Sequence, residues 1–224
     1  MTRKQTHSVS GRAVRLALLL ACSLVMRIGL AGEQQYEPLS ASVQAMLHRS
    51  VADRASPRLT FASQTDGAAW LADMSRRLER HIPDDIARQD FLVTVQYEAS
   101  RAGLDPQLVL GVIQVESKFR KYAISKAGAR GYMQVMPFWS KLIGDGKQNL
   151  FSLRTNLRYG CTILRHYLII ERGDTSRALA RYNGSLGKSR YPENVLRAWA
   201  ADWDYDRGRS RVIISPTRSS KSSR

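Results

Sequence analysis

Cysteine and histidine are scarce in this sequence of 224 residues, and their scarcity excludes several kinds of site. The chain has two cysteines, Cys22 and Cys161, and its four histidines are too scattered to show metal-ligand spacing, so we expect no metal. Cys22 lies in a segment that we expect to be removed, which leaves Cys161 without a partner for an intramolecular disulfide. Cys161 shares the apolar face of a predicted helix with Leu157, Leu164 and Leu168, which favours a core residue over a reactive thiol.

The apolar run near the N-terminus, residues 16–26, is too short to span a bilayer comfortably. Basic residues up to Arg15 precede it and small residues follow it up to Ala31, which is the layout of a secretory signal peptide over residues 1–31. This layout predicts a protein of the periplasm or cell envelope. In one alternative the segment stays uncleaved as a weak anchor. In another Cys22 carries a lipid anchor, which is less favoured because the apolar stretch before it is very short and the residues after it are apolar.

Acidic residues are few, with 19 of them against 35 lysines and arginines, so the net charge is +16. Residues 1–31 and 207–224 contain no acid and contribute +5 and +6 of this charge, so much of the basicity lies in the ends. The moderately basic body suits an anionic partner such as nucleic acid, a membrane surface or a cell-wall polymer, although solubility alone explains the charge equally well. No nucleic-acid recognition motif accompanies the basic tail, so we expect no nucleic-acid partner.

Helical periodicity predicts a mainly α fold with four segments. After the signal peptide, residues 32–84 are predicted to be an N-terminal extension with one amphipathic helix, loosely ordered up to residue 65. Residues 85–205 are predicted to form one domain, and residues 206–224 a basic, disordered tail.

The periodic stretches within these segments give the expected helices. The segment 123–136 lacks helical periodicity and contains Gly128 and Gly131, so we expect a loop or small hairpin there. Asp105 followed by Pro106 is typical of a helix start. The expected helices cover residues 66–81, 84–102, 106–117, 137–143, 154–171, 175–182 and 192–205.

Glu116 occupies an unexpected position in one of these helices. Val109, Val112 and Ile113 lie on one face at helical spacing, and Glu116 is the next position on that face. Burial of a carboxylate on an apolar face raises its pKa, and a carboxyl that stays protonated near neutral pH is what a general acid needs. The structural alternative is a buried ion pair with an arginine such as Arg130.

Four short motifs occur in order around this residue. They are Glu116-Ser117, the stretch from Ala129 to Pro137 (ARGYMQVMP), the helix motif Asn156 to Gly160, and the stretch from Ala178 to Gly184 (ALARYNG). Together they resemble the bacterial lytic transglycosylases of the soluble lytic transglycosylase (SLT) type over about residues 85–205. The resemblance implies a goose-lysozyme-like α-helical domain with a small irregular or hairpin segment near the cleft. The sequence departs from the family pattern at Tyr132, Arg181 and Gly184-Ser185.

The resemblance assigns roles to the first two motifs. Glu116 matches the single catalytic acid and base. Ser117 is expected to orient substrate, or alternatively to cap the helix end. Met133 and Gln134 match the loop that lines the sugar cleft, where Gln134 either bonds substrate or ties the loop backbone.

The last motif and the aromatic residues complete the expected site. Tyr182 matches the tyrosine whose hydroxyl contacts the catalytic glutamate, although a tyrosine at such a position is often a core residue. Asn183 is expected to bond substrate or to cap a helix. One or two aromatic residues are expected to stack on sugar, from the set Tyr122, Tyr132, Phe138, Trp139 and Tyr191.

The family reaction cleaves the β-1,4 bond between N-acetylmuramic acid (MurNAc) and N-acetylglucosamine (GlcNAc) in peptidoglycan. It forms 1,6-anhydro-MurNAc and needs no metal or cofactor. Two-carboxylate glycosidases need a second acid nearby, and the candidates Asp105, Asp145 and Glu193 are better explained by helix caps and turns.

The implied partners are peptidoglycan glycan strands, and the chain is expected to be a monomer. Two alternatives stay open. One is a hydrolytic muramidase, and the other is a wall-binding scaffold component that belongs to an envelope protein complex.

Overall fold

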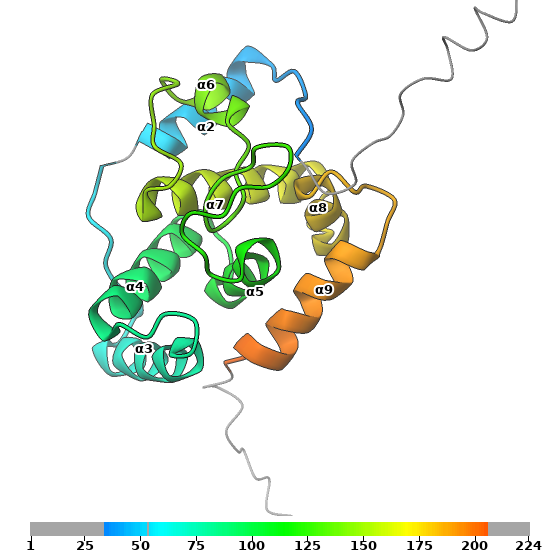
Figure 1. The fold of residues 1–224 in the computed structure, drawn as a ribbon. Helices are drawn as coiled ribbons and strands as arrows, with labels where there is room; N and C mark the ends of the chain where they lie inside the picture. Colours follow the sequence, from blue (N-terminus) through cyan, green and yellow to red (C-terminus); the bar gives the residue numbers. More distant parts are fainter. Residues whose placement is uncertain (1–33, 53, 206–224) are drawn as a thin grey trace, which may run out of the picture. The chain divides into compact units, whose positions relative to one another are not determined.

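The computed structural model describes residues 34–52 and 54–205, and the fold of this part is helical (Figure 1). The predictions of a signal peptide over 1–31, of lipid anchoring at Cys22 and of a disordered tail over 206–224 lie outside the described residues. The mainly α fold class is confirmed, since the described residues form helices and two isolated β-bridges. The helices are α2 (Ala41–Ala52), α3 (Gln64–Leu78), α4 (Asp85–Arg101), α5 (Pro106–Ser117), α6 (Phe138–Ile143), α7 (Leu153–Ile170), α8 (Thr175–Tyr182), α9 (Arg190–Ala198) and the π-helical turn η1 (Trp199–Trp203).

Helix α5 carries Glu116 and lies among the other helices, with α4 and α9 packed against it (Figure 1). It begins as predicted, because the Asp105 side chain accepts a hydrogen bond from the Gln107 N–H and Pro106 occupies the first turn. Every residue from Leu108 to Ile113 is buried. A Cβ at Gly111 would lie 3.1 Å from the Val195 carbonyl oxygen, so glycine lets α9 approach α5 closely.

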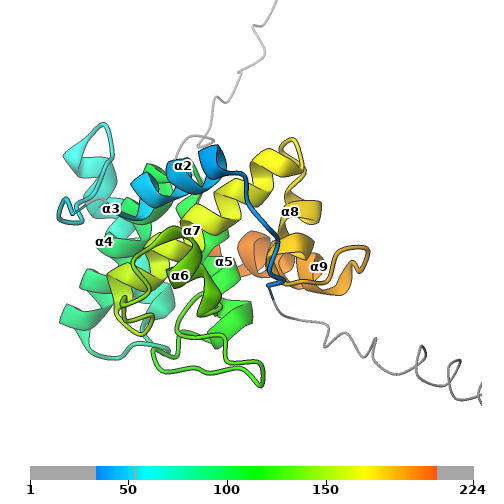
Figure 2. The same ribbon diagram turned by 90° about the horizontal axis from the view of Figure 1, so that it is seen from above.

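The N-terminal extension differs from its prediction. It contains two helices, α2 and α3, and both pack on the core through Leu47, Trp70 and Met74. The prediction of a single helix is wrong because α2 depends on tertiary contacts that its own sequence does not reveal. Helix α2 packs beside α6, and both helices are labelled in Figure 2. The Gln44 side chain, for example, donates a 2.6 Å hydrogen bond to the carbonyl of Leu142 in α6.

The C-terminal end of the fold also differs in detail. The last helix was predicted over residues 192–205, but α9 begins at Arg190 and gives way to the π-helical turn at Trp199. The wider turn accompanies the burial of Trp203, whose indole N–H donates to the Gln114 side chain at 2.5 Å. This bond joins η1 to α5, two residues before Glu116.

Candidate active site

Glu116 lies in the last turn of α5, where the helix ends because Lys118 adopts a left-handed conformation with φ 52°. Glu116 is partly buried, and desolvation raises the pKa of its carboxyl to about 7. Hydrogen bonds from the Tyr191 and Asn183 side chains oppose part of this rise. The carboxyl is therefore about half protonated at neutral pH and can exchange its proton there, which suits a group that acts first as acid and then as base.

The alternative of an ion pair with Arg130 is not what the structure contains. Arg130 is exposed and its guanidinium carbon lies 5.8 Å from the centroid of the Phe151 ring. Among the residues described, no lysine or arginine forms an ion pair with Glu116. Desolvation without a neutralising cation is the reason that its pKa rises.

The tyrosine that contacts Glu116 is Tyr191, and the prediction that Tyr182 does so is wrong. The Tyr191 hydroxyl donates a 2.6 Å hydrogen bond to Oε1 of Glu116, whereas the Tyr182 hydroxyl donates to the Met133 carbonyl at 2.7 Å. The reason is the packing of α9 on α5, which brings the start of α9 to the end of the Glu116 helix. Tyr182 is fully buried in α8 and supports the neighbouring loop instead.

The loop over residues 123–136 is irregular and carries two isolated bridges, as the prediction of a loop or small hairpin anticipated. The Asn156 side chain of α7 anchors this loop by hydrogen bonds. The Asn156 Oδ1 atom accepts from the Met133 N–H, and its Nδ2 atom donates to the carbonyls of Arg130 and Leu150, each at 2.8 Å. Asn156 is fully buried, so these three bonds fix the loop to the helix without competition from water.

Met133 and Gln134 shape this loop from the inside. The Met133 side chain has no exposed surface and packs on Gly160 of α7, where a Cβ would lie 2.7 Å from the Cβ of Met133. Gln134 adopts φ 49°, and its Nε2 atom donates to the carbonyls of Gly131 at 2.8 Å and Ala123 at 3.1 Å. Of the two roles considered for Gln134, the structure contains the one in which it ties the loop backbone.

Ser117 follows Glu116 in the chain, and Asn183 approaches Glu116 from the end of α8. Ser117 is fully buried and its hydroxyl donates to the Ile113 carbonyl at 3.1 Å, so it holds the helix end instead of facing solvent. Asn183 ends α8, is partly exposed, and directs its side chain to the Glu116 carboxyl. The site is thus built by α5, the 123–136 loop, the end of α8 and the start of α9.

The three acids considered as a second carboxylate lie elsewhere in structural roles. Asp105 caps the opposite end of α5, Asp145 accepts from the Lys147 N–H in a turn, and Glu193 is exposed in the first turn of α9. None of the acidic residues that the structure describes contributes to the pKa shift of Glu116.

The aromatic residues considered for sugar stacking divide into buried and exposed groups. Tyr132 and Trp139 are buried in the core, while Tyr122 is 70% exposed and contacts the Phe151 ring. Tyr191 has the role that sequence reasoning missed, and Asn156 was noted only as part of a motif. The aromatic set included Tyr191, and the helix motif included Asn156. The sequence does not show, however, which tyrosine hydroxyl reaches the Glu116 carboxylate.

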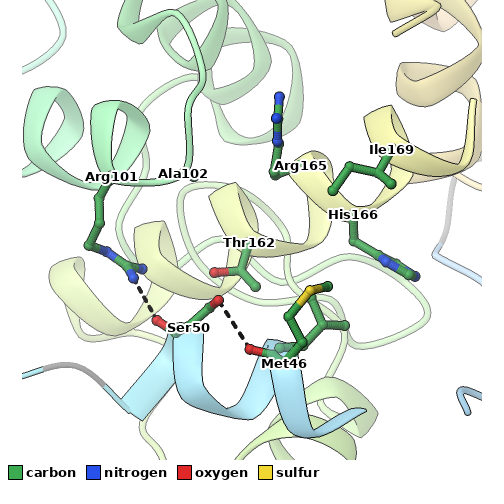
Figure 3. A pocket seen from close by; sticks show the side chains of 9 residues that line it. Met46, Ser50, Arg101, Ala102, Thr162, Arg165, His166 and Ile169 are labelled. Carbon is green, nitrogen blue, oxygen red and sulfur yellow. Dashed lines mark hydrogen bonds between the residues drawn. The ribbon is translucent and has the colours of Figure 1, made fainter. Parts of the chain in front are cut away.

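A separate pocket of about 160 Å³ lies between α2, the end of α4 and α7, and Glu116 is not part of its lining (Figure 3). Arg101 donates to the Ser50 carbonyl at 2.7 Å and the Ser50 hydroxyl donates to the Met46 carbonyl at 3.2 Å, so its polar groups serve the packing of α2. Within residues 34–52 and 54–205, no cluster of three or more histidine, cysteine or acidic side chains is placed to hold a metal ion. In the same residues, no helix combines the length and apolarity needed to cross a bilayer.

Comparison with known proteins finds similarity over the region that carries this site. Residues 94–199 match the model of the transglycosylase SLT domain. The chain is 33% identical over 137 residues to a membrane-bound lytic murein transglycosylase C of Mannheimia succiniciproducens, an alignment that covers 54% of this chain and 37% of the relative. It is 46% identical over 135 residues to the protein of that name in Histophilus somni, covering 53% of this chain and 36% of the relative.

A phage protein is similar as well. The transglycosylase of Enterobacteria phage PRD1 is 34% identical over 111 residues, which covers 46% of this chain and 41% of the phage protein. The chain thus spans about two-fifths of the length of these relatives. The matched region contains Glu116, the loop, Asn156 and Tyr191. Residues 94–199 of this chain therefore match the transglycosylase SLT domain and are similar to the lytic murein transglycosylases named above.

Proposed function

We propose that this chain is an exported peptidoglycan lytic transglycosylase that cleaves the β-1,4 bond between MurNAc and GlcNAc. The observation that carries the proposal is the Glu116 carboxyl, which has a pKa of about 7, accepts a hydrogen bond from Tyr191 and has no ion-pair partner in the described part of the chain. The SLT domain match and the names of the relatives support the same reaction class.

In the proposed reaction Glu116 acts twice. Protonated Glu116 gives its proton to the glycosidic oxygen, so the bond to C1 of MurNAc breaks and GlcNAc leaves with the proton. The N-acetyl group of MurNAc stabilises the sugar cation. Glu116 is then a carboxylate, takes the proton of the MurNAc C6 hydroxyl, and the oxygen attacks C1 to form 1,6-anhydro-MurNAc. No water is added, which is why a second carboxylate to activate water is not required.

The remaining residues of the site position these groups. Tyr191 holds the Glu116 carboxyl by a hydrogen bond, and burial raises the pKa of Tyr191 well above its usual value, so it remains a donor. Asn183 directs its side chain to the same carboxyl. Met133 and Gln134 fix the conformation of the 123–136 loop. Ser117 bonds the backbone at the end of α5, and the Tyr182 hydroxyl bonds the Met133 carbonyl of the loop.

The test is a digest of purified sacculi by the protein and by its Glu116→Gln variant, with products identified by mass spectrometry. We expect anhydro-muropeptides from the unchanged protein and at least about a 100-fold lower yield from the variant. Muropeptides with a reducing end would instead identify a hydrolytic muramidase. An absence of products from both proteins, with binding to sacculi retained, would identify a wall-binding scaffold.

A further inference from the structure

The segment of residues 34–39, named here the N-terminal strap, is not part of any helix. It leads into α2 and passes beside α8 in both views of the ribbon (Figures 1 and 2). Gln34 is only 5% exposed although its neighbours Gln35 and Tyr36 are exposed. A polar side chain buried at one point of an otherwise exposed segment indicates a specific binding position for that side chain.

The position that Gln34 occupies adjoins the 123–136 loop of the candidate active site. Its Oε1 atom accepts a 3.1 Å hydrogen bond from the backbone N–H of Met136, at the end of the loop that carries Met133 and Gln134. Its amide also lies beside the Tyr182 hydroxyl, and Tyr182 in turn interacts electrostatically with Glu116. The Nε2 atom of Gln34 is buried without a hydrogen bond of good geometry, so this position does not satisfy the glutamine side chain completely.

A second contact of the strap involves an acidic group. Oε1 of Glu37 lies 2.9 Å from Nη1 of Arg181, and Arg181 also pairs with Glu171 at 2.6 Å. Arg181 directly precedes Tyr182 and Asn183 in the chain. A pocket of about 180 Å³ adjoins this contact, lined by Gln35, Glu37, Arg181, Gly184 and Leu186.

The two anchoring groups of the strap are a carboxamide and a carboxylate three residues apart. Peptidoglycan presents the same two groups, since its sugars carry N-acetyl amides and its stem peptides end in carboxylates. We propose that the N-terminal strap occupies the substrate position of this site, with the Gln34 carboxamide in the place of an N-acetyl amide and Glu37 holding Arg181 in the place of a stem-peptide carboxylate. This inference rests on the proposed function, because it takes the substrate to be peptidoglycan.

The strap is held weakly enough to be displaced. Arg181 and Glu37 are partly exposed, and ion pairs of this kind contribute little net free energy. The Tyr36 ring adds an edge contact to Phe138 at 5.6 Å, but it is 61% exposed. Glycan must therefore compete with a tethered group of modest affinity, and the strap lowers the apparent affinity for substrate without abolishing it.

The experiment measures the binding of a GlcNAc tetramer by calorimetry in the full chain. Gln34→Ala removes the carboxamide, and Gln64→Ala is the control because it removes the same group from an exposed position at the start of α3, outside the strap and the site. We expect the tetramer to bind about three- to tenfold more tightly to Gln34→Ala and with unchanged affinity to Gln64→Ala. Glu37→Lys, which repels Arg181 and leaves Gln34 intact, is expected to tighten tetramer binding as well.

The reverse result would show that the strap is a permanent wall of the binding site. In that case Gln34→Ala and Glu37→Lys would bind the tetramer more weakly than the unchanged protein, and the proposal would be overturned. Equal binding by the variants and the unchanged protein would overturn it as well. The melting temperature of each variant identifies any loss of folding. The sacculus digest separates the strap proposal from the proposed function. Tighter tetramer binding without anhydro products would support the strap proposal and reject the transglycosylase. Anhydro products with unchanged tetramer binding would support the transglycosylase and reject the strap proposal.

Discussion

The Tyr191 hydroxyl meets Oε1 of Glu116 at 2.6 Å across a separation of 75 residues. This bond is the only one from a tyrosine to that carboxylate in the part of the chain that the structure describes, and it joins the last turn of α5 to the first turn of α9. A donor at this place favours the ionised carboxylate, whereas desolvation favours the protonated one. The pKa of about 7 is the balance of these two effects.

Removing the donor should move the pH dependence of the reaction. Glu116 must be protonated to act as the acid, so the rate is expected to fall above pH 7. Tyr191→Phe removes a hydrogen bond that lowers the pKa of Glu116, so the alkaline fall should shift to higher pH. The measurement is the rate of anhydro-muropeptide release between pH 5 and pH 9. Tyr182→Phe is the control, and its alkaline limb should stay near pH 7; equal shifts in both variants would contradict the assigned contacts.

The same carboxyl should make stability depend on pH. The pKa of Glu116 is raised in the folded protein from 4.5 to about 7, so the folded state holds the proton while the unfolded state loses it. The free energy of unfolding therefore decreases between these pH values, by about 1–3 kcal/mol in all. The Glu116→Gln variant has no carboxyl to ionise at this position, so its free energy of unfolding should not decrease in this way. The variant should be more stable than the unchanged protein at pH 8 but not at pH 4. Urea unfolding at both pH values measures the difference, and a constant difference would argue against a raised pKa.

Asn156 should be essential to the loop. Asn156→Ala leaves the Met133 N–H and two carbonyls without their partner in a fully buried place, which we expect to cost about 3–5 kcal/mol in unfolding free energy. Activity should fall with it, because the loop beside Glu116 loses its anchor. Asn149→Ala is the control, since Asn149 is exposed and accepts one local bond from the Phe151 N–H. Its cost should stay below about 1 kcal/mol, and similar losses for both variants would reject this account.

Gly160 should tolerate no side chain while Met133 is present. Gly160→Ala places a Cβ against the Met133 side chain, and the overpacking should lower the unfolding free energy by about 1–3 kcal/mol or more. Combining it with Met133→Ala removes the overlap, so the double variant should be more stable than the sum of the two single losses predicts. Thermal unfolding of the four proteins measures this coupling. Strict additivity would mean that the two residues do not press on each other.

Local signals in the sequence predicted most of the helices well. Asp105 was recognised as a helix start, and its side chain accepts a hydrogen bond from a backbone N–H in the first turn. Cys161 was assigned to the core and has no exposed surface. These features depend on neighbours in the chain, so a single sequence contains the information they need. Helix α2 was missed because its stability comes from contacts with residues about 95 positions away.

The sequence by itself predicted Glu116 as the acid of the candidate site. A carboxylate on the apolar face of α5 was readable from helical spacing, and its raised pKa follows from burial. Only the tertiary structure decided which groups surround it. Tyr182 and Tyr191 are nine residues apart and chemically identical, and the packing of α9 on α5 determines that Tyr191 reaches Glu116 while Tyr182 supports the loop. The burial of Gln34 was likewise decided by the fold, because hydrogen bonds between distant segments depend on three-dimensional packing and leave no periodic pattern in the chain.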